Sequence, residues 1–412
     1  MQASNKYSHK TFIRSFLLTI FLLNMIFDGM GQSKWRFAVL GDTHVGSSDT
    51  VAEMIPYMLA DSIECVLVCG DLAEGGLACS AAELEAQLTR WQSIFAPLYD
   101  AGIGVYPVNG NHEDDAHNNI SVWNTVFSGT FALPQNGPSG EQNLTYSFTH
   151  KNALFIGLDN YVTIHTVNQN WLDQQLNSNT LPHVFVFGHE AAFKVFHGDC
   201  LDDSVTKRNA FWQSLTEANV RAYFCGHDHF VDVAKVDDGD GNANNDVYQY
   251  LVGTGGGWLM SQYSNYNGTN SPYLPKRIFH DMEFGYTLVE VSGENYNDCE
   301  VTITWKKRIW NSLIQSNTYE ATANIIQYSS CTPTGINTEP AKTFSVHPNP
   351  ANGSITVSGI SGFTTIFNET GSEIWSGEIE GAQNIDISTY KNGLYFIRNN
   401  NTVHQFMVVK NN

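Results

Sequence analysis

The chain has 412 residues, of which 42% are hydrophobic, and a formal net charge of −20 at pH 7. This length predicts roughly two or three domains, with enough apolar residues to build a core in each. The charge excludes nucleic acid and anionic membranes as main partners, because like charges repel phosphate groups.

The first 31 residues have the pattern of an export signal peptide. A basic start precedes the mostly apolar stretch Ser15–Phe27, and Gly29-Met30-Gly31 offers small residues for cleavage before Gln32. The alternative is an uncleaved membrane anchor, although the apolar stretch is short for a span. We expect no transmembrane segment in the mature chain.

From Trp35 to about Arg308, strand and helix patterns alternate and then give way to strands. The expected elements are strand 35–40, helix 50–61, a strand ending at residue 70, helix 81–98, strand 103–108, a hairpin over 146–159, a helix around 171–172, and strands 183–187, 222–225, 231–236, 247–253, 285–291 and 300–306. This alternation predicts an α/β fold, with a layered β-sheet sandwich flanked by helices.

Five short motifs rich in histidine and aspartate lie at the ends of these strands. They are D-T-H at 42–44, G-D at 70–71, G-N-H-E at 110–113, G-H at 188–189 and G-H-D-H at 226–229. In α/β sheets, ligands gather outside the carboxyl ends of the strands. We therefore expect one metal site assembled from separate loops.

The motifs supply seven candidate metal ligands: Asp42, His44, Asp71, Asn111, His189, His227 and His229. This mixed oxygen and nitrogen set suits Mn, Fe or Zn and lacks the thiolates of closed structural zinc sites. Seven ligands are too many for one ion with an open position, but they fit two divalent metal ions bridged by Asp71. Such a pair clamps the attacking and leaving oxygens of phosphoryl transfer, which indicates a small phosphorylated substrate.

The five motifs resemble those of the calcineurin-like metallophosphoesterase superfamily over roughly Trp35 to Val291. By this resemblance, the first metal is held by Asp42, His44, Asp71 and His229, and the second by Asp71, Asn111, His189 and His227. The resemblance also implies a catalytic role for His112 over the leaving group, as transition-state stabiliser or general acid. A hydroxide bridging the two ions would attack phosphorus in line.

The second half of this region is similar to the small purple acid phosphatases in residues 226–229, 250–257 and 284–286. Two departures separate the chain from that family. Its D-x-G motif has a glycine where this chain has His44, and its G-D-x-x-Y motif has a tyrosine where this chain has Glu74. Without the tyrosine, the site lacks a hard metal ligand and the group that gives purple acid phosphatases their colour. The resemblance therefore favours a pair of divalent ions over a ferric centre.

Other candidate residues each have a second interpretation. Asp159 either supports the site or belongs to a strand-end turn, and Glu113 and Asp114 either orient the catalytic histidine or are solvated. His197 and His280 either line the pocket or are structural. Residues 255–257, three glycines, either let the backbone approach the site or bend a strand. Specificity is expected in loops 118–143 and 261–281.

Two further features lie outside the motifs. The acidic segment 237–246 resembles a calcium loop, but an alanine replaces the required glycine and no glutamate closes it, so we expect a solvated hairpin turn. Seven cysteines leave at least one unpaired within the chain. Cys65 and Cys69 are expected as buried free thiols, while Cys299 and Cys331 are candidates for a disulfide.

Short alternating strands with Gly and Asn turns predict a small all-β sandwich at the C-terminus. Phe344–Gly353, Ile385–Ser388 and Gly393–Tyr395 resemble the C-terminal sorting domain of type IX secretion substrates. The resemblance implies the type IX secretion machinery as a partner, with passage through the periplasm to the outer cell surface or the medium. The alternative is an ordinary accessory domain. The predicted order is signal peptide 1–31, catalytic domain 32–330, linker 331–343 and sorting domain 344–412.

The predicted function is therefore a secreted metal-dependent phosphoric ester hydrolase, with phosphate monoesters as the first choice of substrate. A phosphodiesterase is the close alternative, because the D-x-H form is common among diesterases. Nucleotidase activity is a third option, although no nucleotide-binding domain follows. A non-catalytic surface binding module is the competing class.

Overall fold

The computed structural model describes residues 34–261, 263–264, 266, 272–293, 299–329, 345–368, 372–399 and 402–410. The chain divides into two compact units, Met1–Cys331 and Thr332–Asn412, which are described separately. The predicted signal peptide and linker lie outside the described residues. No helix among those described is long and apolar enough to cross a membrane.

The first sheet of the larger unit has the strand order β13-β12-β11-β1-β2-β3. Its strands are β1 (Lys34–Leu40), β2 (Cys65–Val68), β3 (Gly104–Pro107), β11 (Gly285–Ser292), β12 (Glu300–Asn311) and β13 (Ser316–Ser329). The first three run parallel, joined by the crossover helices α2 (Thr50–Ala60) and α3 (Ala81–Asp100), while the last three add antiparallel pairs.

The second sheet has the strand order β10-β8-β9-β7-β6-β5-β4. Its strands are β4 (Tyr146–His150), β5 (Ala153–Gly157), β6 (His183–Phe187), β7 (Ala222–Cys225), β8 (Val231–Asp237), β9 (Val247–Val252) and β10 (Leu274–Asp281). Parallel pairing joins β5, β6, β7 and β9. The helices α6 (Gln169–Ser178) and α7 (Val205–Glu217) connect the parallel strands.

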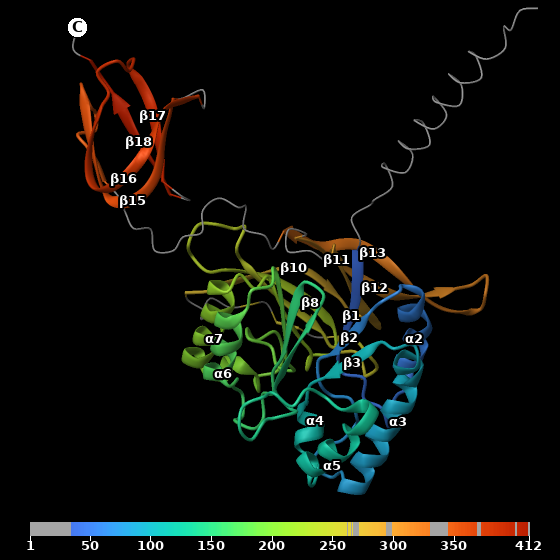
Figure 1. Cartoon of the computed structure of the whole chain (residues 1–412). Coiled ribbons are helices and arrows are strands. Elements are labelled where there is room, and N and C mark those ends of the chain that lie inside the picture. Colours follow the sequence, from blue (N-terminus) through green and yellow to red (C-terminus); the bar gives the residue numbers. More distant parts are fainter. Residues whose placement is uncertain are drawn as a thin grey trace, which may run out of the picture. The chain divides into compact units, whose positions relative to one another are not determined.

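The main core fills the space between the two sheets. Phe37 of β1 meets Phe155 and Phe185 of the second sheet, with ring centroids 5.2 and 4.8 Å apart. Leu154 and Ile156 alternate with Phe155 and belong to a second core, together with residues of α6 and α7. Helices therefore flank both sheets (Figure 1). The predicted α/β sandwich is confirmed.

Several elements were not predicted from the sequence. Parts of the two expected specificity loops form helices or strands. The loop 118–143 contains α5 (Asn119–Val126) and a 3₁₀ helix, Gly129–Phe131, and the loop 261–281 contains β10. The helix α4 (Asn111–Asp114) is a single turn within the third motif. The apolar periodicity of α7 is obscured because its first buried position is Arg208.

The smaller unit is one antiparallel sheet of β14 (Ser345–His347), β15 (Ser354–Asn368), β16 (Glu373–Asp386), β17 (Gly393–Asn399) and β18 (Thr402–Val408). A bridge joins Ala351, which follows β14, to Val408 of β18, so the sheet is nearly closed around an apolar core. The predicted all-β domain is confirmed. The expected short strands 354–358 and 364–367 are one long strand, β15, and the expected strands 373–375 and 384–387 are likewise one strand, β16.

The cysteines are consistent with the expected free thiols. Cys65 and Cys69 are buried and free, and Cys79, Cys200 and Cys225 are free as well. Cys299 forms a disulfide. Cys331, its predicted partner, lies outside the described residues.

Candidate metal centre

The predicted site residues meet at one edge of the two sheets. Asp42 and His44 follow β1, and Asp71 follows β2. Asn111 and His112 follow β3, whereas His189 follows β6, and His227 and His229 follow β7. The carboxyl ends of these five parallel strands thus supply every residue of the motifs.

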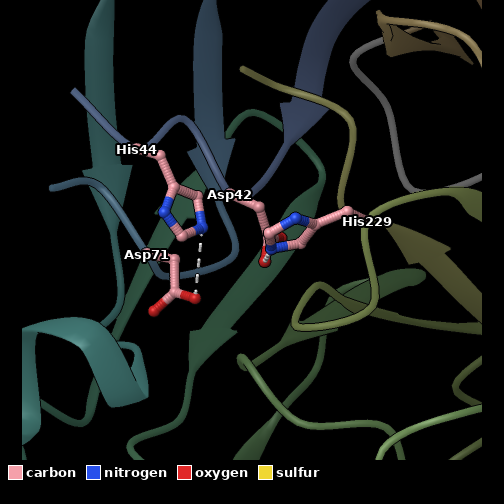
Figure 2. Close-up of side chains that lie close together, drawn as sticks. All are labelled: Asp42, His44, Asp71 and His229. Atoms are coloured by element: carbon pink, nitrogen blue, oxygen red, sulfur yellow. Dashed lines mark ion pairs between the residues drawn. The ribbon is translucent and has the colours of Figure 1, made fainter. Parts of the chain in front are cut away.

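The first group of ligand side chains consists of Asp42, His44, Asp71 and His229, all buried. Each offers one ligand atom, and these atoms lie within 4.8 Å of one another. The Nε2 atom of His44 is 3.6 Å from Asp71 Oδ2, and that of His229 is 3.5 Å from Asp42 Oδ1 (Figure 2). These separations exceed a hydrogen bond and leave room for a cation between the atoms.

The second group consists of Asp71, His189 and His227, which are also buried and meet the same 4.8 Å criterion. Asn111 belongs with them, because its Oδ1 is 3.0 Å from both His189 Nε2 and His227 Nδ1. The two groups share Asp71. The structure thus brings together all seven residues that the sequence singled out, in two adjoining groups.

In three of the four ligand imidazoles, a second hydrogen bond sets which nitrogen faces the ligand group. The Nδ1 atom of His189 donates to the Cys69 carbonyl at 2.7 Å, and that of His229 to the Trp258 carbonyl at 2.8 Å. His44 Nδ1 donates to Glu74 Oε2 at 3.2 Å. Each bond fixes the tautomer with an unprotonated Nε2, which is the form that binds metals.

Glu74 stands where the purple acid phosphatase motif has a tyrosine, and it is hydrogen-bonded to His44. Its carboxylate accepts from His44 Nδ1 and, at 2.7 Å, from Ser47 Oγ. It lies behind the imidazole and orients it. Glu74 thus supports a ligand in this chain.

The buried donor set fits metal ions. Nε2 of His44, which faces the first group, is buried without a hydrogen-bond partner among the described residues. Burial raises the pKa of Asp42 well above its usual range. Burial also acts on Asp71, but the neighbouring imidazoles, His189 first, hold its pKa well below the usual value. Buried charges of this kind require a partner, and divalent cations satisfy both carboxylates and imidazoles.

The backbone around the ligands adopts an uncommon conformation. Asp42, His44, Asp71 and His227 have positive φ angles of 57°, 45°, 51° and 72°. Non-glycine residues rarely adopt this left-handed conformation, and it is held only where surrounding structure determines it. Here the Asp42 and His44 amides donate to the Gly70 and Asp71 carbonyls, at 3.0 and 3.1 Å.

Residues 255–257 approach the site closely, as one of the two interpretations expected. The amides of Gly255 and Gly257 donate to the Gly41 and Asp42 carbonyls, both at 2.8 Å. A Cβ atom on Gly257 would lie 2.7 Å from the His44 ring. The glycines therefore admit this segment beside the first ligand group.

His112 lies next to the ligands without belonging to either group. Its ring centroid is 4.5 Å from that of His44, and its amide donates to Asp71 Oδ1 at 3.0 Å. Nδ1 is hydrogen-bonded to the Glu74 carbonyl. Burial lowers the pKa of His112, but the Asp71 carboxylate, the Glu74 carbonyl and the Glu113 carboxylate together outweigh this effect, so the pKa is raised.

Glu113 is buried and shapes the loop that carries His112. Its two carboxylate oxygens accept from the Ala73 amide at 2.8 Å and the Gly110 amide at 3.0 Å. Burial raises the pKa of Glu113 to about 8. The solvated alternative is wrong for Glu113, which ties the second and third motifs together.

The remaining candidates have structural partners. Asp159 accepts from the Tyr161 and Val162 amides in a strand-end turn, and Asp114 accepts from the Asn119 side chain. His280 is paired with Asp232 at 2.8 Å. The segment 237–246 joins the antiparallel strands β8 and β9 as a hairpin turn.

His197 is the exception among these candidates. Its ring centroid is 4.6 Å from that of His227, and its Nδ1 is 2.7 Å from Asp228 Oδ1. His197 therefore borders the second ligand group.

Two residues near the ligands were not singled out from the sequence. Asp199 Oδ1 is 3.5 Å from His227 Nε2. The Trp258 carbonyl accepts from His229. Neither belongs to a motif, and only the folded loops bring them to the site.

Two family models each match a part of the chain. Residues 36–231 match the family model of calcineurin-like phosphoesterases, and residues 345–410 match the secretion system C-terminal sorting domain. The chain thus carries a calcineurin-like phosphoesterase domain followed by a sorting domain. The sorting domain indicates secretion by the type IX system to the cell surface or the medium.

Solved structures show the same fold at low sequence identity. The purple acid phosphatase PPD1 from yellow lupin (Lupinus luteus) seeds is 16% identical with a TM-score of 0.52, covering 73% of this chain and 54% of the lupin chain. This chain thus spans about half the length of the lupin protein. A structure of PhoD is 12% identical with a TM-score of 0.52, covering 74% of each chain. No curated protein matches the chain.

Proposed function

We propose that the chain is a secreted phosphoesterase that hydrolyses phosphate monoesters at a centre of two divalent metal ions. The observation that carries the proposal is that two groups of buried ligand side chains share Asp71. Their oxygen and nitrogen donors suit Mn, Fe or Zn. When bound, such ions activate water as a nucleophile near neutral pH and neutralise charge on the phosphate.

The protein's own residues would orient the ligands and assist the leaving group. The bonds to Nδ1 of His44, His189 and His229 hold Nε2 of each ring toward the ions. His112 has Nδ1 engaged by the Glu74 carbonyl, which leaves Nε2 for the leaving oxygen of the ester. A histidine in this position would donate a proton or hydrogen bond to the departing alkoxide.

The second candidate function is phosphodiester hydrolysis at the same centre. It is favoured by His44, which gives the D-x-H form common among diesterases and lies within the first ligand group. The two candidates share the ligands and His112. They differ in the ester that the centre accepts.

The proposal is tested with protein reconstituted with Mn, Fe(II) or Zn and assayed on p-nitrophenyl phosphate and bis(p-nitrophenyl) phosphate. We expect monoester hydrolysis to dominate and His112→Asn to lower kcat by about 10²–10⁴-fold with unchanged metal content. His117→Asn is the matched control, because His117 is an exposed histidine five residues further on. Fewer than one bound metal together with an unaffected rate for His112→Asn would refute the proposal.

A further inference from the structure

Trp258 is a large aromatic residue that is left in solvent beside the candidate metal centre. It is 72% exposed, whereas Trp35, Trp91, Trp123, Trp212 and Trp305 are almost fully buried. Its ring centroid lies 5.7 Å from that of His229, with the two planes at 71°. The indole therefore borders the first ligand group and still has free surface.

Short hydrogen bonds fix the main chain at Trp258 relative to the ligands. Its carbonyl accepts from His229 Nδ1 at 2.8 Å. On one side the Gly257 amide donates to the Asp42 carbonyl at 2.8 Å, and on the other the Met260 amide donates to the His229 carbonyl at 3.1 Å. The indole is thus attached to a backbone that is held at the first ligand group.

A second exposed apolar residue, Leu77, follows a segment that is hydrogen-bonded to the His112 main chain. Leu77 is 76% exposed. It follows Gly76, whose amide donates to the His112 carbonyl at 2.7 Å. The successive ring contacts His112–His44, His44–His229 and His229–Trp258 connect His112 to Trp258. An exposed apolar residue thus follows the segment that is bonded to the His112 main chain, and an exposed aromatic side chain contacts His229.

We propose that Trp258 is a specificity residue that stacks against a planar aromatic group of the substrate. This inference rests on the proposed function and specifies its substrate class, namely phosphate esters of aryl alcohols or nucleosides. An exposed indole face offers a large, rigid apolar surface, and stacking on it tolerates any planar ring. The phosphate would lie at the ligands while the ring it carries covers Trp258.

The test measures binding separately from turnover. The metal-loaded wild type and Trp258→Ala are titrated with phenylphosphonate and methylphosphonate, which share the anionic head and differ in the ring. We expect wild type to bind phenylphosphonate about tenfold more tightly than methylphosphonate. Trp258→Ala should bind the two phosphonates about equally. Trp258→Phe should keep most of it. Trp310→Ala, which removes another exposed tryptophan on β12, should keep all of it.

The same proteins are then assayed on phenyl phosphate, adenosine 5′-monophosphate and glycerol 3-phosphate. Trp258→Ala should raise KM for the aromatic esters about tenfold and leave glycerol phosphate unchanged, and the two aromatic esters distinguish an aryl from a nucleoside substrate. An equal loss on all three, or an unchanged phosphonate preference, would overturn the inference while the proposed function stands. A Trp258-dependent phosphonate preference without any turnover would support the inference and contradict the proposed function.

Discussion

Replacing Gly70 by alanine should damage the second ligand group through a single methyl group. Gly70 has a φ of +78°, and a Cβ atom there would lie 2.3 Å from His189 Nδ1 and 2.7 Å from its Cγ. His189 is fully buried and held by the Cys69 carbonyl, so the ring has no free space into which it can move. The methyl group must displace the imidazole and its hydrogen bond.

Gly102 provides a matched control for this substitution. It has the same φ of +78°, but nothing lies within 4 Å of the position where its Cβ would be. Gly102→Ala should therefore lower the free energy of unfolding by only the cost of the left-handed conformation, about 1–2 kcal/mol. Gly70→Ala should add about 1–3 kcal/mol for overpacking.

The effect on metal binding separates the two variants further. Disturbing the partner of a metal-binding histidine lowers metal affinity by about 10–100-fold, and this loss is expected for Gly70→Ala alone. Urea unfolding of the metal-free proteins gives the stabilities, and calorimetric titration with Zn or Mn gives the affinities. Equal stabilities and equal affinities in Gly70→Ala and Gly102→Ala would refute the reasoning.

Three further predictions follow from the same structure. Burial raises the pKa of Asp159 to about 6, so the folded state holds its proton more tightly than the unfolded state, and its contribution to stability falls as pH rises from about 4 to 6. Asp159→Asn should therefore gain up to about 3 kcal/mol in unfolding free energy over wild type between pH 4 and 7, measured by urea unfolding; a pH-independent difference would contradict this. Chelation should lower the unfolding free energy by about 2.7 kcal/mol relative to protein at 100 times the dissociation constant of the metal, and an unchanged melting curve would exclude a bound ion. Deleting Thr332–Asn412 should leave activity within about twofold, because all predicted ligands lie in the larger unit, while cell fractionation should find the shortened protein in the periplasm; surface localisation would contradict the sorting role.

The sequence predicted the site well because each motif follows an apolar strand. The strands preceding His189 and His227 were predicted at 183–187 and 222–225, the bounds that β6 and β7 have in the structure. Parallel strands place their carboxyl ends at one edge, so strand assignment alone brings the motifs together. The shared position of Asp71 then follows from its place after β2, the strand that lies between β1 and β3 in the first sheet.

Other features depend on tertiary contacts that a linear pattern does not contain. Arg208 occupies a buried position of α7 and interrupts its apolar periodicity. Trp258 lies beside the metal centre in the folded chain, where its carbonyl accepts a hydrogen bond from His229, which is 29 residues earlier in the sequence. Glu74 was identified as a departure from the purple acid phosphatases, but its contact with His44 required the folded loop.

The most direct test of the central proposal is the metal content of active protein, measured by mass spectrometry of the metals after removal of excess ions. The two ligand groups that share Asp71 predict about two divalent ions per chain, with activity rising as the second ion binds. His229→Ala and His189→Ala should each reduce the ratio, because each removes a ligand from one group. Full activity with about one ion per chain would contradict the dinuclear centre.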